Sequence, residues 1–297
     1  MARNTFKQLT IKAILEYIEE NLEVKSINID SIVCFSGYSR RYLQSLFKLH
    51  IGIPIGRYIQ LRRVSRAAVL LRLTTLTLTS IAGMLCYDSQ QTFTREFKKN
   101  TGYTPLQYRN SKLWTFKNLT GPKDIVTNMP IPEICSFEKK LFSGTSLSYE
   151  EDIPFIGRNS ERKWSYVRNY LFENKHSSIK VSHEVHPSIR NKVKIKLVFW
   201  STKKKHHHVR GVLMPGTYAK FKYKGSIKNY IQYINHIYMN VLPFWGLQKR
   251  NTNDLEIIYQ DTNGDYYFEY YLPIFYDYVS NITEFVFKKT DSGNLSQ

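Results

Sequence analysis

Cysteine is scarce in this chain of 297 residues, and long apolar runs are missing. The three cysteines, Cys34, Cys86 and Cys135, are odd in number and widely spaced, which argues against a disulfide framework or a paired metal-ligand motif. A membrane-spanning helix needs about 20 successive apolar residues, and the N-terminus lacks an apolar stretch of signal-peptide type. We therefore expect a cytoplasmic protein whose cysteines are small buried side chains.

Acidic residues are also few. The chain has 24 Asp and Glu against 43 Lys and Arg, a net charge of +19. Such an excess favours a polyanionic partner, because each cation set against a phosphate releases condensed counterions. Residues 1–112 hold 17 of the cations and 7 of the acids, so the net charge is +10 there and +9 in the remainder. Charge alone therefore does not assign nucleic-acid binding to one part of the chain.

The residue pattern changes near position 115. Residues 9–22 carry an apolar stripe at helical spacing, with Thr10 as a plausible N-cap. From Val126 onward, short runs of Tyr, Phe, Val and Ile are broken by Gly, Pro and Asn, which is typical of strands. We predict two domains: an all-α domain over 1–112 and an α+β domain with an antiparallel sheet over 126–290. A linker over 113–125 contains the turn signal Gly121-Pro122.

The front part contains a repeat with a period near fifty residues. Ser31-Ile32 recurs as Ser80-Ile81, Phe47-Lys48 as Phe97-Lys98, and Tyr58 as Tyr108. Tyr38, Gly52 and Pro54 likewise recur as Tyr87, Gly102 and Pro105. Each copy predicts two helices around a tight turn, a helix-turn-helix unit.

Local signals place the turns and the connection between the units. Gly37 suits a helix end, because a residue without Cβ tolerates positive φ, and Ser39 can cap the next helix. In the second copy, Asp88 or Ser89 has the capping role. Residues 55–73 predict one helix of roughly 27 Å, which approaches the ~34 Å between successive major-groove openings. One monomer can then insert two recognition helices into DNA.

The second helix of each unit exposes residue types that read DNA. Gln and Arg pair with adenine and guanine edges, and Thr bonds or touches thymine. The predicted DNA-contacting residues are Arg40, Arg41, Gln44, Ser45, Lys48, Gln90, Gln91, Thr92, Arg95, Lys98 and Lys99. The arginines of the connecting helix either add to this basic surface or are ordinary helix-surface charges; they are Arg57, Arg62, Arg63, Arg66 and Arg72.

Residues 21–109 resemble the AraC/XylS family of transcriptional regulators, in its MarA/SoxS/Rob branch. The stretch Asp88 to Arg95, then Phe97-Lys98-Lys99 and Thr104-Pro105, is similar to the second recognition helix of that branch and its C-terminal flank. Gly37-Tyr38-Ser39 with Leu43-Gln44 is similar to the first. The resemblance implies that Gln44, Gln90, Gln91, Thr92 and Arg95 face bases. Arg41 and Ser45 stand where the branch has Trp and Arg, so Arg41 either reads guanine or holds phosphate.

The rear part resembles the GyrI-like domain that Rob-type members carry. The matching stretches are Met214 to Tyr218, Phe221 to Gly225, Asp254 to Glu256 and Phe268 to Ile274. This resemblance implies a small-molecule sensor attached to an activator that contacts RNA polymerase at stress, multidrug-resistance or antibiotic-resistance promoters.

One acid, Glu269, lies in the strand candidate Phe268 to Ile274 among many rings. Burying a carboxylate costs free energy unless a partner compensates it, and an aromatic site with an acid suits amphipathic or cationic molecules. We predict an effector site containing Glu269, Tyr267, Tyr271 and Trp164. The alternative is that Glu269 pairs with a basic neighbour on a strand face.

Other functions fit the sequence less well. A nonspecific architectural DNA binder shares the charge excess, and some domains similar to the rear part hydrolyse small substrates. No nucleophile–base–acid set or phosphate loop is visible, however, and the consecutive His206, His207 and His208 would point alternately on a strand. We expect that the chain is not an enzyme and that it binds no metal, cofactor or membrane. The expected partners are double-stranded promoter DNA at the nucleoid, RNA polymerase and a small effector.

Overall fold

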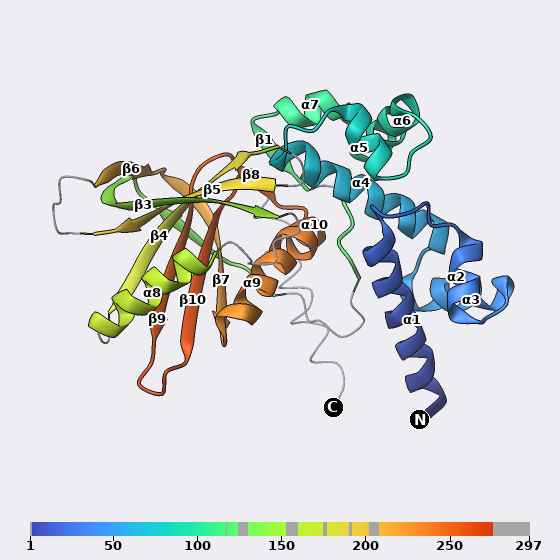
Figure 1. Cartoon of the computed structure of the whole chain (residues 1–297), viewed down its shortest axis with the longest axis horizontal. Helices are drawn as coiled ribbons and strands as arrows, with labels where there is room; N and C mark the ends of the chain where they lie inside the picture. The colour runs from blue at the N-terminus through green and yellow to red at the C-terminus, as the bar shows by residue number, and fades with distance from the viewer. Residues whose placement is uncertain are drawn as a thin grey trace, which may run out of the picture. The chain divides into compact units, whose positions relative to one another are not determined.

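The computed structural model describes residues 2–116, 118–123, 130–152, 160–174, 177–189, 192–201 and 208–275. The chain divides into two compact units (Figure 1). The helical unit comprises Met1–Arg72, Leu76–Ser111 and Asn118–Met129, and the sheet unit comprises Leu73–Thr75, Lys112–Lys117 and Pro130–Gln297. No helix within the described ranges combines the length and apolarity needed to cross a membrane. An all-α part followed by an α+β part is therefore what the chain folds into.

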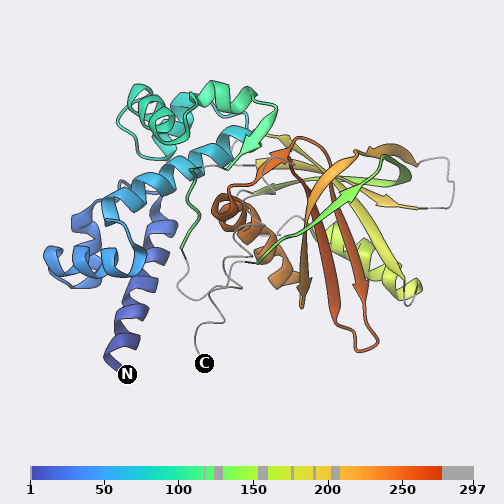
Figure 2. The same cartoon turned by 180° about the vertical axis from the view of Figure 1, so that it is seen from behind.

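Helix α4 is the long rod of the helical unit, with α1–α3 toward its N-terminal end and α5–α7 toward its C-terminal end (Figures 1 and 2). Its bounds, Ile55–Leu73, are those that the sequence predicted. The other helices are α1 (Ala2–Asn21), α2 (Ile29–Ser36), α3 (Arg40–Ile51), α5 (Leu78–Met84), α6 (Gln90–Thr101) and α7 (Pro105–Asn110).

The two helix-turn-helix units are built alike, as the repeat predicted. The Ser39 hydroxyl caps α3 by accepting from the Tyr42 N–H, and Ser89 caps α6 in the same way at Thr92. Both helices end at a left-handed glycine, Gly52 at φ 85° and Gly102 at φ 82°. Equivalent rings also pack together: Phe47 and Tyr58 have centroids 5.6 Å apart, and Phe97 and Tyr108 5.3 Å apart.

The start of the first helix was predicted wrongly. Helix α1 begins at Ala2, so Thr10 lies in its interior and is not an N-cap. Its hydroxyl instead donates to the Phe6 carbonyl at 2.9 Å, one turn back. Threonine satisfies its hydroxyl in this way inside helices, so a capping residue type alone does not fix a helix start.

The sheet unit contains an eight-stranded sheet in the order β2-β7-β10-β9-β4-β5-β3-β6, in which all neighbours are antiparallel. Its strands are β2 (Glu133–Phe137), β3 (Lys140–Asp152), β4 (Ser178–Pro187), β5 (Lys192–Trp200), β6 (Val209–Leu213), β7 (Gly216–Lys224), β9 (Asp254–Gln260) and β10 (Tyr266–Pro273). The helices are α8 (Glu161–Glu173), α9 (Ile227–His236) and α10 (Leu242–Trp245), and the π-helix η1 (Ile237–Val241) joins the last two.

The sheet repeats one arrangement twice. Strands and helix β3–α8–β4–β5 are followed by β7–α9–β9–β10, and the sheet order β3-β5-β4 is mirrored by β9-β10-β7. Rings of Trp164 in α8 and Tyr230 in α9 both contact Phe268 of β10, with centroids 6.2 and 3.8 Å away, so both helices pack on the same face. The two halves meet where β4 pairs with β9, at the centre of the sheet.

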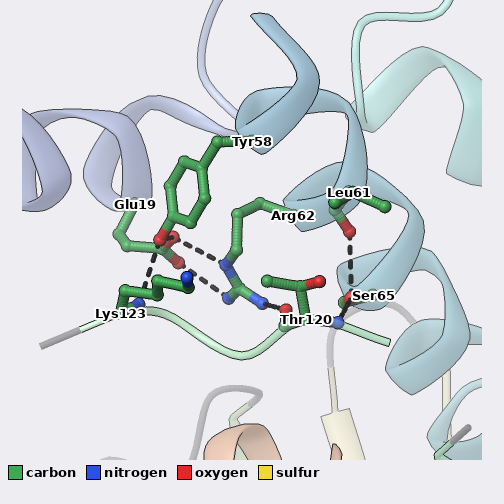
Figure 3. Close-up of polar contacts among 7 residues, drawn as sticks. All are labelled: Glu19, Tyr58, Leu61, Arg62, Ser65, Thr120 and Lys123. Atoms are coloured by element: carbon green, nitrogen blue, oxygen red, sulfur yellow. Dashed lines mark hydrogen bonds and ion pairs between the residues drawn. The ribbon is translucent and has the colours of Figure 1, made fainter. Parts of the chain in front are cut away.

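The segment 113–125, which the sequence suggested as a linker, contains ordered structure in its described residues. Leu113–Thr115 forms strand β1, which pairs with β8 (Gln248–Arg250). Residues 118–123, which we call the strap, lie along α1 and α4 in the helical unit (Figure 3). The Thr120 N–H donates to the Ser65 hydroxyl at 2.7 Å, and the Lys123 N–H donates to the Tyr58 hydroxyl at 3.0 Å. The strap therefore belongs to the packing of the helical unit.

Candidate DNA interface and effector site

The predicted DNA-contacting side chains share the outer faces of α3 and α6. Ten of the eleven are exposed and Thr92 is half-buried. The opposite faces hold Leu43 and Phe47 in α3, and Phe93 and Phe97 in α6, all at 0% exposure. The apolar faces thus hold each helix against its unit and leave the Gln, Thr, Arg and Lys side chains outward.

These polar side chains differ in whether they already have a hydrogen-bond or ion-pair partner in the protein. Within the described residues, the side chains of Gln44, Gln91 and Arg95 form no hydrogen bond or ion pair. Arg40 is ion-paired with Asp30, and the Gln90 side-chain carbonyl accepts from the Thr79 hydroxyl at 2.7 Å. Arg40 and Gln90 thus each have a protein partner at one side-chain atom, whereas Gln44, Gln91 and Arg95 have none within the described residues.

Most arginines of the connecting helix have structural roles. The Arg62 side chain is 4% exposed and donates Nε and Nη2 to the two carboxylate oxygens of Glu19, at 2.7 and 2.9 Å (Figure 3). Burial lowers the pKa of Arg62, but Glu19 outweighs burial and raises it. Arg66 is paired with Glu23 and is also buried. Because these pairs join α4 to α1 and to the turn that follows it, the interpretation of these two residues as helix-surface charges was wrong.

Arg72 is also engaged. Its guanidinium donates to the carbonyls of Ser111 at 2.5 Å and Tyr108 at 3.2 Å, which ties α4 to the end of α7. Only Arg57 among the arginines of this helix is exposed, and it donates to the Gln60 side chain at 2.6 Å. The connecting helix is thus a rod fixed by buried guanidinium groups, as a rigid spacer between two recognition helices requires.

In the sheet unit, Glu269 pairs with a basic neighbour on a strand face, which was the alternative to an effector site. Its carboxylate lies 2.7 Å from Lys220 Nζ and accepts from the Tyr271 hydroxyl at 2.7 Å. Burial raises the pKa of Glu269, but these partners outweigh it and lower the pKa below the usual range. This acid is already satisfied by neighbours on its own sheet face.

The structure does not bring the four predicted effector residues together. Along β10, Tyr267, Glu269 and Tyr271 share one face, because side chains alternate along a strand. Trp164 contacts Phe268, which points to the other face, where α8 and α9 pack. The prediction of one site containing all four residues was therefore wrong, and only Trp164 lies beside a buried acid.

That acid is Glu256 of β9, which is 1% exposed. Its Oε2 lies 2.6 Å from Lys163 Nζ of α8 and 2.7 Å from His183 Nε2 of β4, and the Tyr230 hydroxyl of α9 also faces the carboxylate. Burial raises the pKa of Glu256, but Lys163 and His183 outweigh it and hold the pKa at about 2. Glu256 is therefore a buried, ionised carboxylate at the centre of the sheet.

Aromatic side chains surround this carboxylate. Lys163 Nζ lies 4.3 Å from the Trp164 ring centroid, and Trp164 contacts the Tyr230 and Phe268 rings. Burial and the Glu256 charge raise the pKa of Tyr230, so the phenol stays protonated. Sequence reasoning missed Glu256, although a single acid within the apolar run Leu255-Glu256-Ile257-Ile258 was a usable signal.

Two equivalent helix-turn-helix units on one rod, followed by a separate sheet domain with a buried acid among rings, define a DNA-binding regulator with a sensor domain. Residues 35–111 match the helix-turn-helix domain family, and residues 132–274 match the GyrI-like small molecule binding domain family.

Curated relatives share this architecture. The chain is 41% identical over 273 residues to the F1 operon positive regulatory protein of Yersinia pestis. The aligned residues cover 91% of this chain and 90% of that protein. It is 30% identical over 262 residues to the right origin-binding protein of Escherichia coli (strain K12), which covers 84% and 90%. The activator AarP of Providencia stuartii is 40% identical over 106 residues, 36% of this chain and 78% of AarP.

The chain belongs to the AraC/XylS family of transcriptional regulators, in the Rob-type group that joins the double helix-turn-helix to a GyrI-like domain. It is a transcriptional regulator that binds DNA through the helical unit and small molecules through the sheet unit. The names of these relatives describe regulators of transcription or origin binding and no enzyme.

Across the described residues, no three His, Cys, Asp or Glu side chains gather as a metal site. His206 and His207 of the histidine tract lie outside the described residues.

Proposed function

We propose that this regulator activates transcription by binding asymmetric promoter sites as a monomer, with α3 and α6 in successive major grooves. The observation that carries the proposal is the pair of equally capped helices with free Gln and Arg side chains at the two ends of α4. Its 19 residues give a rod of about 28 Å, which approaches the ~34 Å between groove openings on one DNA face.

The names of relatives support activation. One relative is a positive regulatory protein of an operon and another is a transcriptional activator. The resemblance to the MarA/SoxS/Rob branch further implies that the chain recruits RNA polymerase to stress or antibiotic-resistance promoters. The basic excess of +19 supports tight association with DNA, since counterion release favours binding.

Gel shifts with a promoter found by genome-wide mapping of bound sites test the DNA face. Gln91→Ala and Arg95→Ala should each weaken specific binding by about 1–3 kcal/mol, because each removes one base contact. Gln232→Ala and Arg162→Ala are matched controls, since both residues are exposed on the sheet unit. Unchanged specific affinity in both test variants contradicts the proposal, and affinity independent of DNA sequence favours an architectural role.

We further propose that the effector contacts the Glu256 cluster and not Glu269. Support comes from the buried, ionised Glu256 carboxylate and from the rings of Trp164 and Tyr230 beside it. A cationic or amphipathic molecule would pair with that carboxylate and stack on the rings.

Binding of a lipophilic cation such as tetraphenylphosphonium, followed by calorimetry, tests the effector site. Glu256→Gln should weaken binding at least tenfold, roughly the effect of losing one charge-assisted contact, and Trp164→Leu should weaken it less. Glu269→Gln is the matched control and should bind as the unaltered chain does. The reverse order of Glu256→Gln and Glu269→Gln would place the site on the other sheet face.

A further inference from the structure

The helical unit contains a pocket of about 310 Å³ that neither the DNA face nor the Glu256 cluster uses. Its lining comes from Ile27, Asn28 and Ile29 at the start of α2, from Gly56, Ile59, Gln60 and Arg63 along α4, and from Tyr87 and Glu96 of the second helix-turn-helix unit. Pockets of about 300–1,000 Å³ hold small organic ligands. Because both helix-turn-helix units and the rod between them contribute, an occupant would touch all three.

The pocket holds polar groups that the protein leaves unsatisfied. Arg63 Nε and Nη2 and the Tyr87 hydroxyl are buried and form no hydrogen bond within the described residues. An unpaired buried donor costs free energy, and a charged one costs most. Nε and Nη2 lie on one edge of the planar guanidinium, the edge at which a carboxylate or phosphate accepts two parallel hydrogen bonds.

The one carboxylate in the lining is engaged elsewhere. Glu96 accepts from the Gln60 side-chain amide, and Gln60 in turn accepts from Arg57 at 2.6 Å. Burial raises the pKa of Tyr87 to about 12, with Arg63 opposing and Glu96 adding to the shift. The phenol therefore stays protonated at neutral pH and adds a third donor beside the guanidinium edge. Arg63 Nε, Arg63 Nη2 and the Tyr87 hydroxyl are thus three donors without a protein acceptor, and an oxyanion would accept hydrogen bonds from all three.

We propose that this pocket binds a small organic acid, whose carboxylate accepts from Arg63 and Tyr87 and whose apolar body packs on Ile27, Ile29 and Ile59. The isoleucine lining favours a compact acid with a ring or branched chain over an inorganic anion. Glu96 opposes any anion here by charge repulsion, which limits the affinity. An occupied pocket bridges the two helix-turn-helix units and thereby couples acid binding to the relative placement of α3 and α6.

Benzoate is the probe, with benzamide as its uncharged match, and binding to the full-length chain is followed by calorimetry and by NMR shifts. Benzoate should bind at least tenfold more tightly than benzamide, about the difference that a charge-assisted bidentate contact makes. Arg63→Gln should remove this preference and Tyr87→Phe should reduce it several-fold. Glu96→Gln should strengthen benzoate binding, which a merely structural role of the pocket would not do. Lys112→Gln, which removes an exposed charge outside the pocket, should change nothing.

Three results would overturn the proposal. One is equal binding of benzoate and benzamide, and another is benzoate binding that survives Arg63→Gln but disappears in Glu256→Gln. The third is no benzoate binding, with Arg63→Gln instead weakening DNA affinity and reducing the salt slope by about one, which identifies a DNA phosphate as the occupant. If Arg63→Gln fails to fold, Tyr87→Phe and Glu96→Gln still test the proposal. The first should reduce the preference for benzoate, and the second should strengthen benzoate binding. None of these results bears on Gln91 and Arg95 as base contacts.

Discussion

Three buried cations within the described residues are paired with acids by the fold. Arg62 meets Glu19, Arg66 meets Glu23, and Lys163 meets Glu256. Removing one member leaves the other charge buried without compensation, which costs far more than breaking an exposed pair. The spacing of four between Arg62 and Arg66 shows why the pairs form: it places both on the face of α4 that α1 covers.

Glu19→Gln should lower the free energy of unfolding by about 3–5 kcal/mol, since Arg62 would remain buried without its counter-charge. The measurement is urea unfolding of the full-length chain. Glu16→Gln is the matched control on the same helix, because Glu16 is 62% exposed and lies 3.9 Å from Lys12. Similar losses in the two variants would mean that the Arg62–Glu19 pair contributes no more than a surface pair.

Glu256 makes the stability of the sheet unit depend on pH. Its pKa of about 2 lies below the ordinary value of 4.5, so the carboxylate stabilises the folded state above pH 4.5 and loses that contribution as the pH falls toward 2. Unfolding free energies of the full-length chain measured from about pH 6 to about pH 3 should decline, and Glu256→Gln should flatten that decline. An unchanged slope in the variant would assign the acid sensitivity to other carboxylates.

At the scale of helices, the serine that starts each recognition helix sets the position of the DNA face. Ser39 and Ser89 accept from the N–H groups of Tyr42 and Thr92, which fixes the first turn of α3 and α6. Residues one turn further on, Gln44 and Arg95 among them, owe their direction to that first turn. The capping signals were readable in the sequence because they act within three residues of each other.

Ser39→Ala and Ser89→Ala should each cost about 1 kcal/mol of stability, the usual effect of losing an N-cap. Ser45→Ala is the control within α3, and it should be neutral or slightly stabilising, since alanine favours a helix interior. Thermal unfolding of the full-length chain reports the differences. A stable Ser89→Ala protein with no loss would show that packing alone sets the start of α6.

At the scale of the whole molecule, the strap shows that the helical unit extends past its last helix. Arg62 donates to the Thr120 carbonyl, Thr120 and Lys123 donate to Ser65 and Tyr58, and Lys123 Nζ donates to the Ile51 carbonyl at 2.8 Å (Figure 3). A helical fragment that stops before these residues removes one hydrogen-bond partner from each of Tyr58, Arg62 and Ser65 of α4.

A fragment of residues 1–123 should therefore be more stable than a fragment of residues 1–112, by about 1 kcal/mol for each hydrogen bond that the strap supplies. Urea midpoints of the two fragments measure the difference, and DNA binding by the longer fragment shows that it is folded. Equal midpoints would mean that the strap packs on the helical unit without stabilising it.

Local signals in the sequence were enough to define the elements of the helical unit and their order. The apolar stripes, the two capping serines and the terminal glycines each act within a few turns, and the fifty-residue repeat relates one unit to the other. Together they predicted α3, α4 and α6 with the outward direction of Gln91 and Arg95. The boundary between helices and strands near residue 115 was readable from side-chain types alone. Only the start of α1 failed among these features, because Thr10 satisfies its hydroxyl equally well inside a helix.

Which polar residues meet was settled only by the packing of distant elements. Glu256 bonds Lys163 and His183 across 93 and 73 residues of sequence, and Arg62 bonds Glu19 across 43. Strand register then put Glu269 and Trp164 on opposite faces of the sheet. Such pairings depend on how strands and helices pack against one another. The spacing of residues along the chain does not show which distant side chains will come into contact.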